Sequence, residues 1–152
     1  MINTKDEVII RNILAADKQS WENLWQQYLH FYRADITPEI TEKTFVRLCQ
    51  GDSLSGLVAV NHDGQVLGLT HIVYHASTWS EKDYCYISDL FVDKSARGKN
   101  VAEKLFNAAY QQADSRGASK VYWMTQEFNS SARSLYDKIG QRTSFVIYQR
   151  KE

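Results

Sequence analysis

The order of the strand-like and helical segments in the middle of the chain constrains the fold most. Three strand-like segments, Leu54–Asn61, Gln65–Ala76 and Tyr84–Val92, follow one another with short polar breaks between them. A long helical segment, Arg97–Arg116, and a further strand, Lys120–Thr125, come next. Strands joined by short turns pair antiparallel, whereas a strand–helix–strand crossover gives a parallel pair. The sequence therefore predicts a mixed α/β sheet with helices packed against it.

The segments on either side of this block extend the same architecture. Val8–Leu14 is rich in β-branched residues and predicts a first strand, after which Asp17 is expected to cap a helix. A second predicted helix runs from Pro38 to about Cys49. A fourth, after Arg97–Arg116, is Ser130–Ile139, and Ser144–Gln149 predicts a final strand. The residues that give the first helix its apolar face are Trp21, Leu24, Trp25, Tyr28, Leu29 and Tyr32. Residues 1–152 are therefore expected to form a single domain.

Composition and charge argue against several classes of function. Lys plus Arg and Asp plus Glu are balanced at 18 each, which disfavours a nucleic-acid or membrane-surface partner. Neither the two cysteines, Cys49 and Cys85, nor the histidines have the spacing of a metal site, so we expect no metal. The start of the chain lacks a signal-peptide core, and no apolar run reaches the roughly 18 residues of a membrane helix. A cytoplasmic location is the resulting expectation.

The loop between the third strand and the long helix has the composition of an anion-binding loop. A helix N-terminus presents about four unpaired backbone N–H groups and a partial positive charge. Arg97 and Lys99 add full charges, and the small residues Gly98 and Ala102 allow a phosphate to approach the backbone. By themselves these residues fit an ordinary helix start with solvated side chains equally well.

The same residues resemble the pyrophosphate-binding loop of the GNAT superfamily of N-acetyltransferases, which reads Arg/Gln-x-x-Gly-x-Gly/Ala. One position departs from that pattern, because Asn100 stands where the family usually has glycine. Asparagine tolerates the left-handed backbone conformation better than other non-glycine residues, although its side chain adds atoms close to the phosphates. Asp93, just before the loop, would oppose an anion unless its carboxylate points away. The resemblance implies that the pyrophosphate of coenzyme A is bound by Arg97, Gly98, Lys99, Asn100, Val101 and Ala102.

A second segment at the expected distance supports the resemblance. Residues 129–140 are similar to the family pattern Asn-x-x-Ala-x-x-x-Tyr-x-x-x-Gly, with Asn129, Ala132 and Tyr136 falling near one face of a helix. The similarity covers almost the whole chain, and its pattern is closest to the small yeast histone and D-amino-acid acetyltransferases of the Hpa type. It implies a GNAT-like α/β fold: a mixed, mostly antiparallel sheet flanked by helices, with a central splayed strand pair.

The activity implied by the resemblance is direct transfer of an acetyl group from acetyl-CoA to a primary amine of a small molecule, amino acid or lysine side chain. The backbone of Leu90, Phe91 and Val92 is implied to contact the cofactor beside a β-bulge, although composition alone fits an unbroken strand. Tyr136 is the implied acid for the departing sulfur, and its alternative role is packing on a helix face. Asn129 is implied to bind the cofactor, and it also suits a helix N-cap.

The general base and the acceptor site are less defined by the sequence. Asp89 and Glu127 lie beside the presumed site, and a water relay ending in either residue is the family-like arrangement. His71 and His75 lie on one strand at even spacing, and any of these residues is also commonly a satisfied polar group. Tyr32 and Asp89 are expected to line the acceptor pocket. The base therefore stays open at this point.

Two further expectations concern turnover and assembly. Asn100 in place of glycine keeps open a non-catalytic module that binds or senses acyl-CoA. The predicted last strand, Ser144–Gln149, suggests a homodimer formed by strand pairing or exchange.

Overall fold

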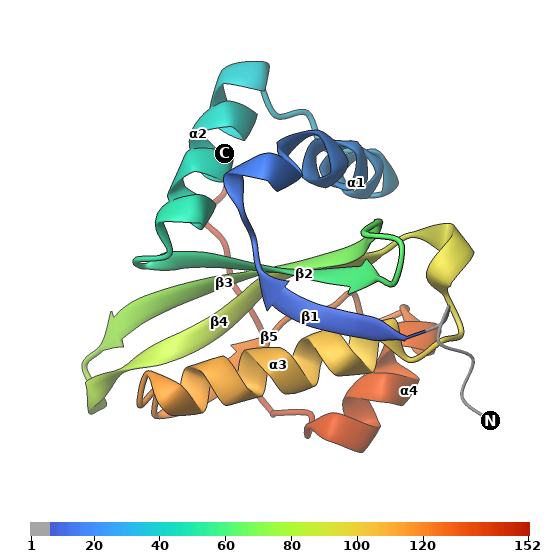
Figure 1. The fold of residues 1–152 in the computed structure, drawn as a ribbon. Coiled ribbons are helices and arrows are strands. Elements are labelled where there is room, and N and C mark those ends of the chain that lie inside the picture. The colour runs from blue at the N-terminus through green and yellow to red at the C-terminus, as the bar shows by residue number, and fades with distance from the viewer. Residues whose placement is uncertain (1–6) are drawn as a thin grey trace.

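The computed structural model describes residues 7–152 and shows five strands in one sheet, in the order β1-β2-β3-β4-β5 (Figure 1). The strands are β1 (Val8–Asn12), β2 (Leu54–Asn61), β3 (Val66–Ser77), β4 (Ser80–Val92) and β5 (Lys120–Trp123). Neighbours among β1 to β4 pair antiparallel, and β5 pairs parallel with β4. The prediction of a mixed, mostly antiparallel sheet is confirmed.

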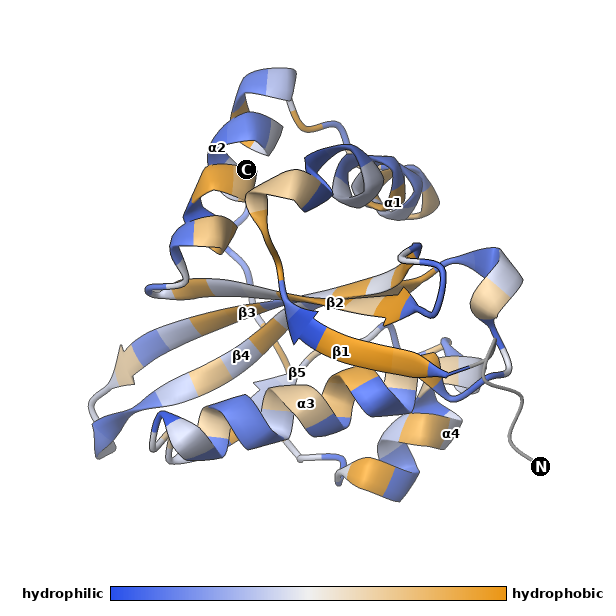
Figure 2. Ribbon diagram, viewed as in Figure 1, coloured by the Kyte–Doolittle hydropathy of each residue, from blue (hydrophilic) through white to orange (hydrophobic). Residues whose placement is uncertain are grey.

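Four helices cover the two faces of the sheet. They are α1 (Lys18–Phe31), α2 (Pro38–Gln50), α3 (Val101–Ser115) and α4 (Ser130–Ile139), and two short 3-10 turns are η2 (Ala15–Asp17) and η3 (Lys94–Ala96). Figure 1 shows α1 and α2 over one face, with α3 and α4 over the other. Figure 2 shows hydrophobic colours along β1 and the middle of the sheet, whereas the tip of the β3–β4 hairpin is largely hydrophilic. The molecule therefore has two apolar layers, one on each side of the sheet.

The two layers have different compositions. Under α1 and α2, Trp21 is fully buried against Phe45 and Leu69. Under α3, Phe106 and Ile72 form the centre of the second cluster. Alternate residues of β3 therefore point to opposite layers, as the two-residue period of a strand requires.

Several predicted boundaries need correction. The helix expected to begin at Arg97 begins at Val101, because Gly98 and Asn100 have left-handed backbone angles that a helix cannot include. Asp17 lies at the start of α1 as predicted, but its carboxylate does not cap that helix. It accepts instead from the Leu14 amide at 2.8 Å and from both terminal nitrogens of Arg11, at 2.7 and 2.9 Å.

The predicted final strand, Ser144–Gln149, is wrong for this structure, because the segment is not assigned to any strand. Its apolar side chains are exposed, with Phe145 at 76% and Tyr148 at 92%. A strand forms only where a neighbour supplies backbone hydrogen-bond partners, and β5, the last strand of the sheet, pairs only with β4. The apolar composition of this segment predicted its capacity to pair but not whether a partner is present.

The sheet opens between its last two strands. Pairing of β4 with β5 ends at Ile87 and Trp123, whereas β4 continues to Val92. Within residues 7–152, no strand pairs with that edge of β4 beyond Ile87. On its other edge, β4 has a bulge: Ile87 pairs with Ile72 and Asp89 with His71, which leaves Ser88 as the extra residue. The splayed pair expected from the resemblance is therefore present.

Candidate active site at the splayed strands β4 and β5

The free edge of β4 supplies the first part of the site. Leu90, Phe91 and Val92 pair with β3 on one side, opposite Thr70, Leu69 and Gly68. A Cβ on Gly68 would lie 3.1 Å from the Phe91 carbonyl oxygen and 3.3 Å from Val101, so this glycine lets α3 pack closely on the sheet. The backbone of these three β4 residues therefore borders the opening between β4 and β5, next to the start of α3.

The loop at the start of α3 supplies the second part. Gly98 has a φ of 80° and Asn100 a φ of 62°, and the Asn100 side chain makes no capping hydrogen bond. Asn100 thus has the left-handed conformation that asparagine tolerates better than other non-glycine residues. A Cβ on Gly98 would meet no atom within 4 Å, so the loop is open on that side. An open, left-handed loop at an uncapped helix start fits a diphosphate, with Arg97, Lys99, Val101 and Ala102 in the same segment.

The carboxylate of Asp93, which could have opposed an anion, is hydrogen-bonded to Ser95 within the same loop. Its carboxylate oxygen accepts from the Ser95 amide at 2.9 Å and from the Ser95 hydroxyl at 2.6 Å. These bonds from Ser95 lower the pKa of Asp93 from its usual value, so the carboxylate is ionised. Arg97 lies over the Phe91 ring at 5.8 Å, at the junction of the loop and β4. The Asp93 carboxylate therefore caps the start of η3.

Tyr136 lies on the second side of the opening. On α4 its ring packs edge-on against Phe106 and Trp123, with centroids 5.5 and 5.6 Å away. Burial raises the pKa of Tyr136, and the neighbouring Tyr32 hydroxyl raises it further. The phenol therefore stays protonated at neutral pH, as a proton donor must. Packing and a chemical role are compatible here, because the ring is held while the half-buried residue remains accessible.

Asn129 and Glu127, the other two predicted site residues near the C-terminal end, differ in how far they are buried. Asn129 precedes α4 and is partly buried, and its side chain makes no capping hydrogen bond, so the N-cap interpretation is wrong for its side chain. Glu127 is exposed, and Arg142 lies 3.8 Å from its carboxylate. The Glu127 carbonyl accepts from Arg133 at 2.7 Å, which ties the loop to α4. The structure thus places Glu127 in solvent rather than in an enclosed site.

Asp89 lies at the bulge, on the face of the sheet covered by α1. Its carboxylate Oδ2 is 2.9 Å from Nδ1 of His71, and its backbone carbonyl accepts from the Thr70 hydroxyl at 2.8 Å. Burial alone would raise the pKa of Asp89, but hydrogen bonds from His71, Tyr28 and Ser88 outweigh it and leave the pKa below its usual value. An ionised carboxylate is therefore held at the point where the strands separate.

Aromatic residues connect Asp89 with Tyr136. Burial raises the pKa of Tyr28, and the adjacent Asp89 carboxylate raises it further. The Tyr28 and Tyr32 rings meet edge-on at 4.9 Å, and Tyr32 is close enough to act electrostatically on Tyr136. Tyr32 is 41% exposed at the end of α1, so it borders the open part of the site. The structure thereby brings together the predicted residues Asp89, Tyr32 and Tyr136.

Two features of the site were missed by the sequence interpretation. Trp21 was assigned only to the core face of α1, yet its indole N–H donates to His71 at 2.9 Å. The bulge at Ser88 was expected only from the resemblance, although the sequence carries a signal for it. Cys85 and Ile87 face the α3 layer at odd positions, whereas Leu90 faces it at an even position. When the positions that face one layer change from odd to even numbers within a strand, one extra residue has been inserted between them.

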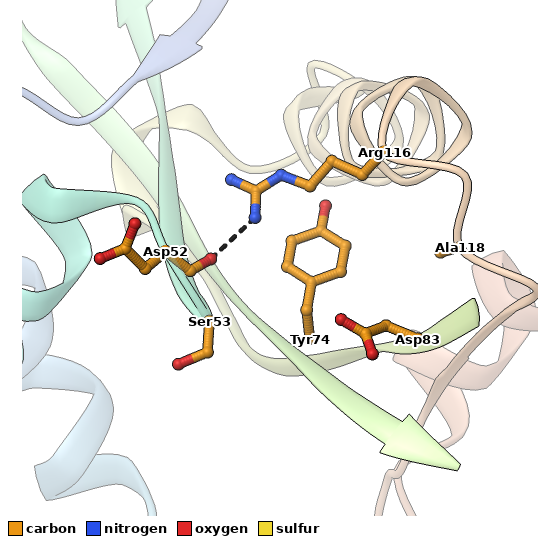
Figure 3. A pocket seen from close by; sticks show the side chains of 6 residues that line it. All are labelled: Asp52, Ser53, Tyr74, Asp83, Arg116 and Ala118. Carbon is orange, nitrogen blue, oxygen red and sulfur yellow. Dashed lines mark hydrogen bonds between the residues drawn. The ribbon is translucent and has the colours of Figure 1, made fainter. Parts of the chain in front are cut away.

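A separate pocket lies at the far end of α3 from the anion-binding loop (Figure 3). Arg116 crosses its wall, 4.3 Å from the centre of the Tyr74 ring, and donates to the carbonyls of Gly51 and Asp52 at 2.8 and 2.7 Å. These contacts join the ends of α2 and α3.

Among residues 7–152 no cluster of side chains could hold a metal ion, and no helix is long and apolar enough to cross a membrane.

Comparisons with known proteins agree with this geometry. The model of the acetyltransferase (GNAT) family matches residues 11–141. The chain is 33% identical to the D-amino-acid N-acetyltransferase HPA3 of Saccharomyces cerevisiae, over 99% of this chain and 93% of that protein. It is 30% identical to the uncharacterized N-acetyltransferase YhfO of Bacillus subtilis, over 91% of this chain and 94% of YhfO. The fold matches that of AAC(6')-Iy in complex with a bisubstrate analogue, with a TM-score of 0.82, 19% identity and coverage of 96% and 99%.

The chain therefore belongs to the GNAT family of acetyltransferases. It is an acyltransferase whose relatives are named N-acetyltransferases, and acetyl-CoA is the co-substrate of this family. The opening between β4 and β5, the left-handed loop before α3 and the protonated Tyr136 are the features of this structure that suit such a co-substrate.

Proposed function

We propose that this protein transfers an acetyl group from acetyl-CoA to the primary amine of a small molecule, with Asp89 on the acceptor side and Tyr136 on the sulfur side. The observation that carries the proposal is that Asp89, Tyr28 and Tyr32 adjoin one another, with Tyr32 close enough to act electrostatically on Tyr136. A proton acceptor and a proton donor thereby border one opening in the sheet. Direct transfer needs that pair, because the amine loses a proton while the thiolate gains one.

Residues of the loop and of β4 would hold the co-substrate. The backbone N–H groups of residues 98–102 and the side chains of Arg97 and Lys99 would bind the pyrophosphate. The free edge of β4 at Leu90–Val92 would pair with the pantetheine arm, and Asn129, at the start of α4, would bind the same arm or the thioester. When bound, acetyl-CoA supplies the thioester carbonyl that the amine attacks.

The two ionisable side chains would then divide the proton transfers. A carbon–nitrogen bond forms and the carbon–sulfur bond breaks. Asp89, ionised, accepts the proton that the amine nitrogen loses, directly or through one water. Tyr136 donates its phenolic proton to the departing sulfur, and both groups recover by exchange with solvent. Glu127 is the weaker base candidate, because it is exposed and its carboxylate lies 3.8 Å from the exposed Arg142.

A small acceptor is favoured by the position of Asp89. Its side chain is only 18% exposed, and it lies behind the half-buried Tyr28. A compact ammonium group could reach that carboxylate, and the surrounding aromatic rings favour a cation. The yeast relative is named as a D-amino-acid N-acetyltransferase. The acceptor panel should therefore include D- and L-amino acids, polyamines and lysine peptides.

The proposal is tested by thiol release from acetyl-CoA in the presence of each amine. We expect acceptor-dependent release, with kcat lowered about 100-fold or more by Tyr136→Phe and by Asp89→Asn. Tyr84→Phe on β4 and Asp63→Asn in the β2–β3 turn make the same chemical changes away from the site and serve as matched controls. Full activity of the Tyr136→Phe and Asp89→Asn variants would refute the assigned roles.

A second candidate function is a module that binds acyl-CoA without turnover, because Asn100 occupies a usual glycine position. Calorimetry with acetyl-CoA separates the two functions when it is combined with the assay. Tight binding without release toward any amine would support the sensing module.

We also propose a homodimer formed through residues 144–149, whose apolar side chains are exposed along an irregular segment. The edge strand β5 is the natural partner for such a segment from a second copy. Light scattering at micromolar concentration should give twice the mass of 17.6 kDa, and a chain truncated after Thr143 should give the monomer mass. A monomeric full-length chain would refute the dimer.

A cytoplasmic location, a single domain and the absence of nucleic-acid partners stay predictions.

A further inference from the structure

A buried series of hydrogen bonds leads from the core under α1 to Asp89. Trp21 on α1 is 0% exposed, and its Nε1 donates to Nε2 of His71 on β3 at 2.9 Å. His71 is 4% exposed, and its Nδ1 lies 2.9 Å from Oδ2 of Asp89. Both nitrogens of the imidazole are therefore occupied inside the protein, so His71 has no ring nitrogen left to act as a base.

These contacts define the tautomer of His71. An indole N–H is a donor only, so Nε2 of His71 must be an acceptor and carry no hydrogen. The single ring hydrogen is then on Nδ1 and is donated to Asp89. A doubly protonated ring would place its Nε2–H against the N–H of Trp21, donor against donor. Trp25 packs on the imidazole at 5.1 Å and helps to hold the ring in this orientation.

The groups that face the Asp89 carboxylate are few. His71 approaches from β3, Tyr28 from α1, and Ser88 and Tyr86 from β4 itself. None of these carries a positive charge when His71 is the neutral tautomer. With His71 in that tautomer, the donors that hold Asp89 are neutral; in a doubly protonated ring, the charge of His71 would also lower the pKa of Asp89. A neutral donor orients a carboxylate while leaving it able to accept a proton, whereas a fixed cation would hold it in the charged form more strongly.

We propose that His71 is a positioning residue that Trp21 holds as the Nδ1–H tautomer, and that this tautomer orients Asp89 toward the acceptor amine. The inference rests on the proposed role of Asp89 as the proton acceptor. During transfer, the proton leaves the amine nitrogen for Asp89, and His71 keeps its own hydrogen throughout. Trp21 and His71 thus affect the reaction by orienting Asp89, without touching the substrate.

The tautomer is measured directly by ¹⁵N–¹H correlation of the imidazole side chains in the full chain without ligand. We expect His71 to give the pattern of a neutral ring protonated at Nδ1, and a mixture of tautomers in Trp21→Phe. A ring protonated at Nε2, or at both nitrogens, would overturn the proposal. This measurement needs no turnover, so it stands even if no amine proves to be an acceptor.

Variants at His71 then test the link to Asp89. His71→Phe removes the donor and leaves Asp89 buried, so the ¹³C titration of the Asp89 carboxyl should move up by about one pH unit or more. The acid limb of kcat/KM for the amine should move in the same direction, with kcat at least about tenfold lower and KM for acetyl-CoA within about twofold. His71→Asn, whose amide can donate to Asp89, should recover most of the loss. His62→Asn, in the exposed β2–β3 turn, is the matched control.

The outcomes separate the two proposals. If no amine is acetylated but the tautomer and the Asp89 titration behave as expected, the proposed function fails and the positioning of Asp89 stands. An unchanged Asp89 titration in His71→Phe, or equal losses in His71→Asn and His71→Phe, would overturn the positioning role. Should His71→Phe fail to fold, the tautomer in the unmodified chain and the Trp21→Phe spectrum decide the question.

Discussion

Replacing Asn100 with alanine should destabilise the protein although the side chain is exposed and makes no capping bond. The backbone at Asn100 has a φ of 62° and a ψ of 22°, a conformation that costs an ordinary L-residue about 1–2 kcal/mol. Asparagine tolerates this region better than alanine does. We therefore expect Asn100→Ala to lower the free energy of unfolding by about 1 kcal/mol, which lowers Tm by about 2–4 °C in a chain of this size.

The matched control is Asn107→Ala. Asn107 is also exposed, but it lies within α3, where the backbone is right-handed helical. Alanine is the better helix former, so the same chemical change should stabilise the protein by up to about 0.5 kcal/mol. The two substitutions are expected to shift Tm in opposite directions. Calorimetric melting of both variants in one buffer measures the difference.

The same substitution should weaken acetyl-CoA binding. If alanine pulls residue 100 out of the left-handed region, the N–H groups at the start of α3 no longer point in the direction that the loop sets. A cost of about 1 kcal/mol corresponds to about a fivefold rise in Kd by calorimetric titration. Asn100→Gly should bind at least as well as the natural chain, because glycine adopts this conformation freely. If Asn100→Ala matched Asn107→Ala in stability and affinity, the conformational argument would be refuted.

Three further predictions concern stability. Gly140→Ala places a Cβ 2.7 Å from the Trp123 ring and should cost about 1–3 kcal/mol in urea unfolding. Asp17→Asn should remove a pH dependence of stability. The hydrogen bond from Arg11 lowers the pKa of Asp17 in the folded protein below 3.8. The ionised carboxylate therefore stabilises the fold above that pH, and this stabilisation is lost as the pH falls through the pKa of the folded state. The variant should therefore lose less stability than the natural chain between pH 7 and pH 3. Arg116→Ala breaks two bonds to carbonyls at the end of α2 and should lower Tm, with only partial recovery by Arg116→Lys.

Much of the fold was predictable because its signals are local. The bounds of β2 and α4 match the predicted ranges, since turn residues and helix periodicity lie within those segments. The left-handed conformation of Asn100 was suggested only by the family pattern, which usually has glycine at this position. The approximate place of Tyr136 followed from helix spacing within one segment, together with the family resemblance.

The parts that could not be predicted depend on contacts between distant segments. Trp21 and His71 are separated by 50 positions and His71 and Asp89 by 18, so their hydrogen bonds exist only once α1 packs on β3 and β4. The sequence left His71 as a candidate base, and its burial between Trp21 and Asp89 leaves neither ring nitrogen free for that role. For residues 144–149 the missing information is the presence of a pairing edge, which composition does not encode.

The bulge at Ser88 decides whether β4 can border a binding site, and deleting Ser88 tests this. At present Ile87 pairs with Ile72 and Asp89 with His71, so removal of the extra residue would keep both pairs and leave every side chain on its present face. The chain should therefore still fold, with Tm changed by only a few degrees. Without the bulge, however, β4 would lose the bend that separates it from β5, and the two strands could continue pairing beyond Ile87.

We expect the Ser88 deletion to weaken acetyl-CoA binding by at least about tenfold, because pairing with β5 would occupy the backbone edge that borders the opening. Ser88→Ala is the matched control, since it removes the hydroxyl and keeps the extra residue, and it should bind acetyl-CoA nearly as well as the natural chain. A folded deletion variant that binds normally would show that the opening does not depend on the bulge. Loss of binding in Ser88→Ala as well would assign the effect to the hydroxyl group instead of the backbone geometry.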